Sequence, residues 1–129
     1  MKKSSLKNVH SFLELKEAGT KITMVTAYDY SMARCAAASE IDIILVGDSL
    51  GMVVLGYENT LKVTMDDMIS HTAAVRRGAP QSFVIADLPY MSYHLGLDDT
   101  KANAAALNIE GGADAVKLEG GSEERLEAI

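Results

Sequence analysis

The feature of this sequence that most constrains its fold is an alternation of two kinds of segment, which begins near Lys21. Short apolar runs rich in β-branched residues alternate with longer alanine-rich or amphipathic segments. Such alternation predicts strands that are each followed by a helix, and therefore a parallel sheet in an α/β fold. The expected strands span residues 22–28, 41–47, 82–87 and 113–118.

The segments between these strands carry helix signals. Residues 30–39, YSMARCAAAS, are rich in alanine, the residue with the highest helix propensity. Thr64 precedes Met65 and two aspartates, a pattern typical of a capped helix start. One face of the helix that follows would present Met65, Met68, Ile69 and Thr72. We expect this face to pack into the core.

Four β/α units are half of a (β/α)8 barrel, or TIM barrel, for which about 250 residues are typical. The chain has 129 residues. A small open parallel sheet is the structural alternative. A helix that starts at Ser122 and stops after about two turns, without glycine or proline, suggests the front part of a longer chain. We therefore expect a helical N-terminal segment at residues 1–20 and a partial, truncated TIM barrel at residues 21–129.

Composition argues against several classes of function. Lys and Arg number 12 against 18 Asp and Glu, a net charge of −6, so binding to nucleic acid is not expected. No stretch approaches the ~18 uninterrupted apolar residues of a membrane span, and the basic N-terminus lacks the apolar region of a secretion signal. The single cysteine, Cys35, excludes an internal disulfide and a cysteine-based zinc cluster, and we expect it to be buried. A cytoplasmic protein is the simplest prediction.

Acidic residues mark the ends of the expected strands. Each strand ends on or just before one of them: Asp29, Asp48, Asp87 and Glu119. In a barrel the carboxyl ends of all strands face one mouth, where functional groups gather. A single acid at such a place is usually a turn residue or a helix cap. Four in phase repel one another unless a cation or protonation offsets their charge, and carboxylate oxygens suit Mg²⁺.

Lys117 lies two residues before Glu119, so the two side chains have the same parity on the fourth strand. It could be an ordinary exposed lysine, but it interrupts a long apolar run. An ammonium group beside a metal site is suited to bind a substrate carboxylate or to stabilise an enolate oxygen. We expect Lys117 to point into the same mouth.

The stretch VGDSLG, residues 46–51, offers a competing interpretation, because GDSLG matches the G-x-S-x-G pattern of a hydrolase nucleophile elbow. That turn requires a helix directly after the serine, whereas the following MVVLGY predicts extended chain. The residues three before the histidines are Lys7, Met68 and Met91, so an Asp-x-x-His partner is absent as well. Without a base, Ser49 would be a poor nucleophile.

Four blocks of the sequence together resemble one enzyme family. They are TAYDYSMA, VGDSLGMVVLGYENTLKVTMDDMISHTAAVRRGAP, ADLPYMSY and VKLEGG, and the resemblance runs from about Lys21 to Gly121. The family is ketopantoate hydroxymethyltransferase, and the chain is similar to its N-terminal half. The resemblance implies a (β/α)8 barrel related to the phosphoenolpyruvate mutase group, a role in pantothenate biosynthesis on the coenzyme A pathway, and a homo-oligomer built from dimers, such as a decamer.

The resemblance also implies a reaction. A hydroxymethyl group passes from 5,10-methylenetetrahydrofolate to 3-methyl-2-oxobutanoate, which gives 2-dehydropantoate through an enolate stabilised by Mg²⁺. By motif, Asp48, Asp87 and Glu119 correspond to the Mg²⁺ site, with Glu119 acting directly or through water. Ser49 and Lys117 correspond to contacts with the carboxylate and oxo group of the substrate, joined by the backbone around Asp48. Asp48 and Asp87 are expected to contact the substrate as well as the ion.

The family's general base is a glutamate in the second half of the barrel, beyond Ile129. Glu123, Glu124 and Glu127 do not match it, and Asp29 has no ligand role to carry over, so it is expected to be a turn or cap residue. We therefore expect the 129-residue chain alone to have little or no transferase activity. The alternative is a noncatalytic half-barrel or split subunit that binds Mg²⁺ and an oxo acid, or that only assembles with a partner chain.

Overall fold

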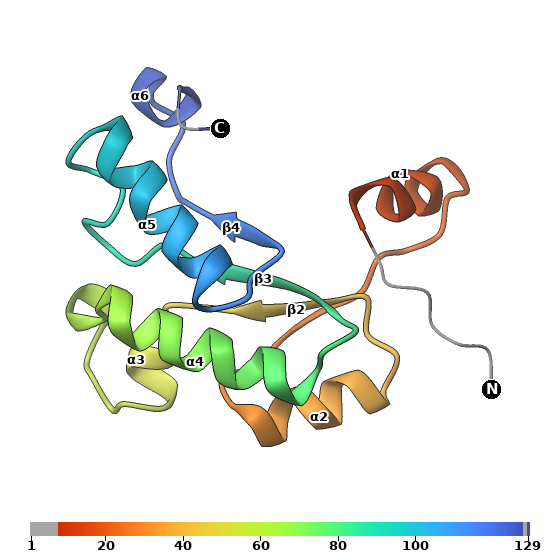
Figure 1. Cartoon of the computed structure of the whole chain (residues 1–129). Helices are drawn as coiled ribbons and strands as arrows, with labels where there is room; N and C mark the ends of the chain where they lie inside the picture. Colours follow the sequence, from red (N-terminus) through yellow and green to blue (C-terminus); the bar gives the residue numbers. More distant parts are fainter. Residues whose placement is uncertain (1–7, 128) are drawn as a thin grey trace.

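The computed structural model describes residues 8–127 and residue 129 (Figure 1). The strands are β1 (Met24–Thr26), β2 (Ile43–Val46), β3 (Phe83–Asp87) and β4 (Ala115–Lys117). The helices are α1 (Val9–Glu17), α2 (Tyr30–Ala38), α3 (Leu50–Val53), α4 (Met65–Gly78), α5 (Leu97–Ile109) and α6 (Glu123–Leu126), with a 3-10 helix η1 (Thr60–Lys62). None of the described helices has the length and apolar character needed to cross a membrane.

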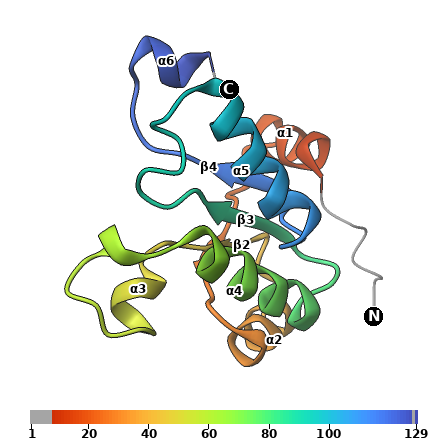
Figure 2. The same cartoon turned by 60° about the vertical axis from the view of Figure 1, so that its left-hand side comes forward.

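The four strands form one parallel sheet in the order β1-β2-β3-β4. Each strand therefore pairs with the next strand of the chain, whereas a doubly wound sheet reverses its order at a switch point. Helices α2, α4 and α5 follow β1, β2 and β3 and lie along one side of the sheet (Figures 1 and 2). This arrangement confirms the prediction of four successive β/α units. Each observed strand is shorter than the range expected from the sequence and lies within it.

Side-chain alternation divides the sheet into two unlike faces. On the helix-covered face, Ile44, Val46 and Val84 are fully buried. The residues between them, Leu45 and Ile85, are only partly covered. Together with neighbouring residues of β1 and β4 they line an apolar hollow of about 540 Å³. The hollow side corresponds to the interior of a barrel wall and the helix side to its exterior.

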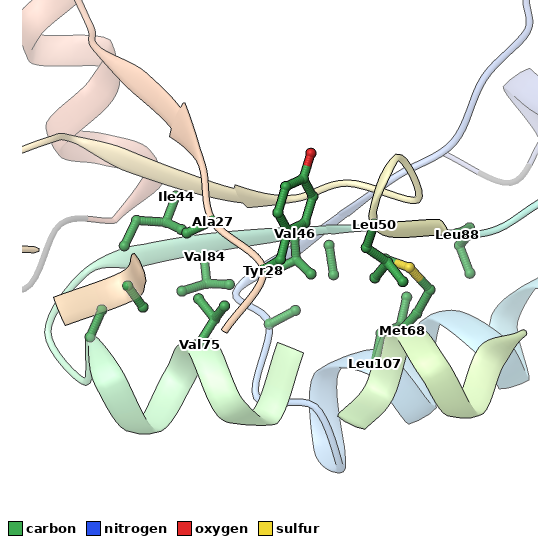
Figure 3. Close-up of a cluster of buried hydrophobic side chains, with 14 of the residues drawn as sticks. Ala27, Tyr28, Ile44, Val46, Leu50, Met68, Val75, Val84, Leu88 and Leu107 are labelled. Carbon is green, nitrogen blue, oxygen red and sulfur yellow. The ribbon is translucent and has the colours of Figure 1, made fainter. Parts of the chain in front are cut away.

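The core lies between the sheet and helices α2, α4 and α5 (Figure 3). On α4 the residues Met68, Thr72 and Val75 are fully buried, which confirms that the face predicted from the sequence packs inward. Helix α2 approaches α4 closely, because a Cβ on Gly78 would lie 2.4 Å from the Tyr30 carbonyl oxygen. Glycine at position 78 therefore allows the backbone at the start of α2 to lie against α4.

One arginine of α4 binds the segments that lead into β3 and β4. Arg76 of α4 donates from Nε to the Gly112 carbonyl at 2.7 Å and from Nη1 to the Ser82 carbonyl at 2.9 Å. It also forms an ion pair with Asp114, whose Oδ2 accepts the Val84 backbone N–H at 2.8 Å. A planar guanidinium with several donors can satisfy these groups together. Helix α4 is thereby tied to the loops that enter β3 and β4.

Helix α1 lies beyond the strand starts, at the end opposite to α3 and α6 (Figure 1). It begins with a capping box, in which the Asn8 side chain accepts the Ser11 backbone N–H and the Ser11 hydroxyl accepts the Asn8 N–H. Its Phe12 ring meets Phe83, the first residue of β3, edge to face at 5.0 Å. This contact covers the apolar inner face at the base of the sheet.

Two expectations from the sequence are wrong. Residues Leu50–Val53 form helix α3, not extended chain. Leu50 is fully buried and Gly51 packs against Val63, so tertiary packing outweighs the strand preference of the valines. Cys35 is exposed, not buried, because α2 turns its neighbours Ala33 and Ala36 toward the core.

Thr72 provides a test of the packing. It is fully buried on α4, and its hydroxyl has no hydrogen-bond partner among the described residues. We expect Thr72→Val, which replaces the hydroxyl with a methyl group, to raise the free energy of unfolding by about 1 kcal/mol in urea titrations. Thr72→Ser, which keeps the hydroxyl and removes the methyl group, should lower it. A valine variant less stable than the wild type would show that the hydroxyl is satisfied in solution.

Candidate functional site

The site lies at the carboxyl ends of the strands. Asp87 is the last residue of β3 and Lys117 the last residue of β4, and the two are paired across the sheet. Both therefore point to the inner face, and Lys117 Nζ lies 2.9 Å from Asp87 Oδ1. Asp48 follows β2, and its backbone N–H donates to Asp87 Oδ2 at 3.2 Å. The structure thus places the Asp87 carboxylate, the Lys117 ammonium and the Asp48 backbone side by side.

Asp87 is an unusual carboxylate because it is almost fully buried, with a side chain only 8% exposed. Burial raises the pKa of the Asp87 carboxyl above its ordinary value, although the Lys117 ammonium opposes this effect. Burial also acts to lower the pKa of Lys117, but the hydrogen bond and charge of Asp87 outweigh it and raise that pKa. Each group therefore favours the charged form of the other, while burial opposes the charge of both.

Gly47 lies beside this pair, and the side chain it lacks defines a small space above its backbone. A Cβ built on Gly47 would lie 2.7 Å from Ser49 Oγ and 3.6 Å from Asp87 Oδ2. The Ser49 hydroxyl and the Asp87 carboxylate therefore border the same space. A side chain at position 47 would occupy part of it, whereas glycine leaves room for a ligand atom.

Tyr28 completes the site and was not predicted from the sequence. Its hydroxyl lies 2.9 Å from Ser49 Oγ, and the residue is only 7% exposed. The ring points away from α4, which carries Val75 (Figure 3). The signal that could have found it is parity, because Tyr28 lies two residues after Thr26 on the inner face of β1.

Asp29 has the structural role expected of it. Its carboxylate accepts the Met32 backbone N–H at 2.8 Å and caps α2. The Asp29 side chain therefore points away from the side chain of the neighbouring Tyr28, as alternation along an extended chain predicts.

The rings of Tyr93 and His94, in the loop after β3, lie with their centroids 4.4 Å apart, and Arg125 lies over the Tyr93 ring. These contacts are packing contacts.

Glu119 stands apart from the two aspartates. Its side chain is 80% exposed, and its contact is with Lys117 Nζ at 3.7 Å. The described residues contain no cluster of three or more acidic, histidine or cysteine side chains that could hold a metal ion. Asp48 and Asp87 nevertheless supply carboxylate oxygens, the ligands that Mg²⁺ takes, although in this structure Asp87 Oδ1 is engaged by the Lys117 ammonium at 2.9 Å. Mg²⁺ in proteins commonly takes one or two carboxylates and fills its remaining positions with water and substrate oxygens.

The serine hydrolase interpretation loses one of its two objections, since a helix does follow Ser49. The second objection, the missing histidine partner of the serine, holds among the described residues. The Ser49 hydroxyl meets Tyr28, and His71 directs its Nδ1 to the Tyr28 backbone carbonyl at 2.6 Å, not to the serine. A neutral phenol is a poor base for activating an alcohol, so this arrangement does not make Ser49 a nucleophile.

Solved structures share the arrangement of elements seen in this chain. A 2,3-dimethylmalate lyase, described as a member of the PEP mutase/isocitrate lyase superfamily, matches 83% of this chain and 36% of its own, with a TM-score of 0.62 and 20% identity. An oxaloacetate acetylhydrolase matches 82% of this chain and 38% of its own, with a TM-score of 0.62 and 17% identity. At these identities the matches establish the fold alone.

Curated relatives are much closer in sequence. The 3-methyl-2-oxobutanoate hydroxymethyltransferases of Bacillus thuringiensis (strain Al Hakam) and Bacillus cereus (strain AH820) are each 56% identical over 118 residues, or 92% of this chain. The chain spans 42% of the length of these relatives. The family model of ketopantoate hydroxymethyltransferase matches residues 7–129. The chain therefore belongs to the ketopantoate hydroxymethyltransferase family.

Proposed function

We propose that this chain supplies the oxo-acid and Mg²⁺ site of an enzyme that transfers a hydroxymethyl group from 5,10-methylenetetrahydrofolate to 3-methyl-2-oxobutanoate, in pantothenate biosynthesis. The observation that carries the proposal is the buried Asp87 carboxylate, paired with Lys117 and bordering the space above Gly47. Burying a carboxylate costs folding free energy unless a partner offsets its charge, as the Lys117 ammonium does here. Family membership supplies the identity of the substrates.

Each residue of the site has a distinct task in this proposal. Lys117, whose side chain is 41% exposed, would direct its ammonium to an oxo or carboxylate oxygen of the substrate. Ser49 can donate its hydroxyl proton to the substrate carboxylate. Gly47 leaves the space into which that carboxylate fits. Together they would hold a flat oxo acid against the ends of β2, β3 and β4.

The site also suits Mg²⁺. Asp48 and Asp87 would hold the ion, and Glu119, being exposed, would contribute through water. When bound, Mg²⁺ would act as a Lewis acid on the keto group and so lower the pKa of the adjacent C–H. The proton at that carbon still needs a general base within hydrogen-bond reach. By resemblance to the family, that base is a glutamate beyond Ile129, and the folate pocket is formed largely by other residues.

The apolar hollow on the inner face supports the view that these residues act as part of a larger unit. Met24 of β1 and Leu45 of β2 line it, and Met24 is 56% exposed. An exposed apolar face of this kind is usually covered by further protein. The proposal therefore includes further β/α units that complete the barrel. We also propose a homo-oligomer built from dimers and a location in the cytoplasm.

The proposal predicts a separation of binding from turnover. The purified chain should bind 3-methyl-2-oxobutanoate in titration calorimetry when Mg²⁺ is present, and should lose that binding when the ion is chelated. It should show little or no transfer from 5,10-methylenetetrahydrofolate, because it lacks the base. Mixing it with a chain that supplies the remaining units of the Bacillus cereus relative should restore transfer. Robust turnover by the chain alone would contradict the proposed role, and activity that the second chain cannot restore would favour a noncatalytic half-barrel.

The space above Gly47 gives a second prediction. In Gly47→Ala, the new methyl group would displace the Ser49 hydroxyl and fill part of the space, so oxo-acid binding should weaken roughly tenfold or more in the same titration. Gly121→Ala is the matched control, because a Cβ there meets nothing within 4 Å. Unfolding of both variants in urea should resemble that of the wild type. Equal binding by Gly47→Ala and the control would remove Gly47 from the site.

The raised pKa of Asp87 gives a third prediction. Since the folded state holds this proton more tightly than the unfolded state does, ionisation of Asp87 subtracts from stability as pH rises through its folded-state pKa. Asp87→Asn cannot ionise there, so its stability relative to the wild type should increase as pH rises from the ordinary carboxyl range and then level off. Urea unfolding of both proteins between about pH 3 and pH 7 measures this difference. A relative stability that falls with rising pH would show that Lys117 dominates the pair.

A further inference from the structure

Ser49 is held by a second hydroxyl that the proposed reaction does not explain. Tyr28 Oη lies 2.9 Å from Ser49 Oγ, and either atom could donate the proton between them. Both residues lie where strands end, Tyr28 after β1 and Ser49 after β2. The contact therefore links the first two β/α units directly beside the space above Gly47.

The direction of this hydrogen bond decides what Ser49 can do. A serine hydroxyl has one proton, so if Ser49 donates it to Tyr28 it has none for a bound anion. A phenol is more acidic than an alcohol and is the better donor of the two. If Tyr28 donates to Ser49, the serine proton is left for the ligand. Successive hydrogen bonds in one direction also polarise one another and so strengthen donation at the end of the chain.

Tyr28 is built to hold a fixed position. Its ring belongs to the buried core. Its backbone carbonyl accepts from His71 Nδ1 at 2.6 Å, which fixes that nitrogen as the protonated one in the neutral ring. The preceding residue, Ala27, donates its backbone N–H to the Leu45 carbonyl at 3.0 Å.

We propose that Tyr28 is a positioning residue: its hydroxyl donates to Ser49 Oγ and thereby directs the Ser49 proton at the carboxylate of the bound oxo acid. This inference rests on the function proposed above and adds a residue to it. Asp87 Oδ2 borders the same space, but a carboxylate oxygen can only accept hydrogen bonds and does so from the Asp48 backbone N–H. The donor that faces an anionic ligand from this side is therefore Ser49, and Tyr28 sets its orientation.

The test uses the whole chain with Mg²⁺ and 3-methyl-2-oxobutanoate in titration calorimetry. Tyr28→Phe keeps the buried ring and removes the hydroxyl, and it should weaken binding by about threefold to tenfold. Ser49→Ala should weaken binding at least as much. The double variant should bind like Ser49→Ala alone, because Tyr28 acts through Ser49. Tyr30→Phe is the matched control, since Tyr30 lies on α2 and is half-exposed.

A second measurement addresses the direction of the bond without removing it. Replacement of Tyr28 by 3-fluorotyrosine makes the phenol more acidic, so binding should tighten if Tyr28 is the donor. Weaker binding would mean that Ser49 donates to Tyr28 and would overturn the inference. So would unchanged binding in Tyr28→Phe, or a double variant whose loss equals the product of the single losses. Failure of the wild type to bind the oxo acid would instead overturn the proposed function itself, together with the role given to Tyr28.

Discussion

The structure depends on one geometric constraint, the two-residue alternation of side chains along strands whose outer face is buried. Ile44, Val46 and Val84 are buried under the helices. Because successive side chains of a strand point to opposite faces, Leu45, Ile85 and Asp87 point to the inner face. A shift of one residue in β3 would turn the Asp87 carboxylate toward the core. The position of the reactive groups is thus determined by the same burial that stabilises the sheet.

This constraint explains how much could be predicted from the sequence. The four β/α units, the capped start of α4 at Thr64 and the inward face of that helix all follow from periodicity and local signals. The meeting of Asp87 with Lys117 follows as well, because residues of equal parity at neighbouring strand ends must converge. Parity applied to β1 would also have found Tyr28.

What could not be predicted depends on contacts between distant segments. Helix α3 forms although its valines favour strands, because Leu50 is buried and Gly51 meets Val63. Cys35 is exposed because the orientation of α2 is set by its neighbours, not by the cysteine's own preference. Glu119 lies two residues beyond the end of β4, as Tyr28 does beyond β1, but its side chain is 80% exposed, so parity alone does not determine which of two such residues is buried.

The arginine at the opposite end of the sheet has a consequence for how such a chain can change. Arg76 and its partners fasten the strand starts, whereas every group assigned to the ligand lies at the strand ends. The contacts that stabilise the sheet and the groups proposed to bind the ligand therefore lie at opposite ends of the same strands. Substitutions could accumulate around the mouth, altering what is bound there, while the fastened base keeps the sheet in register. A protein divided in this way is free to acquire new substrates without first having to acquire a new fold.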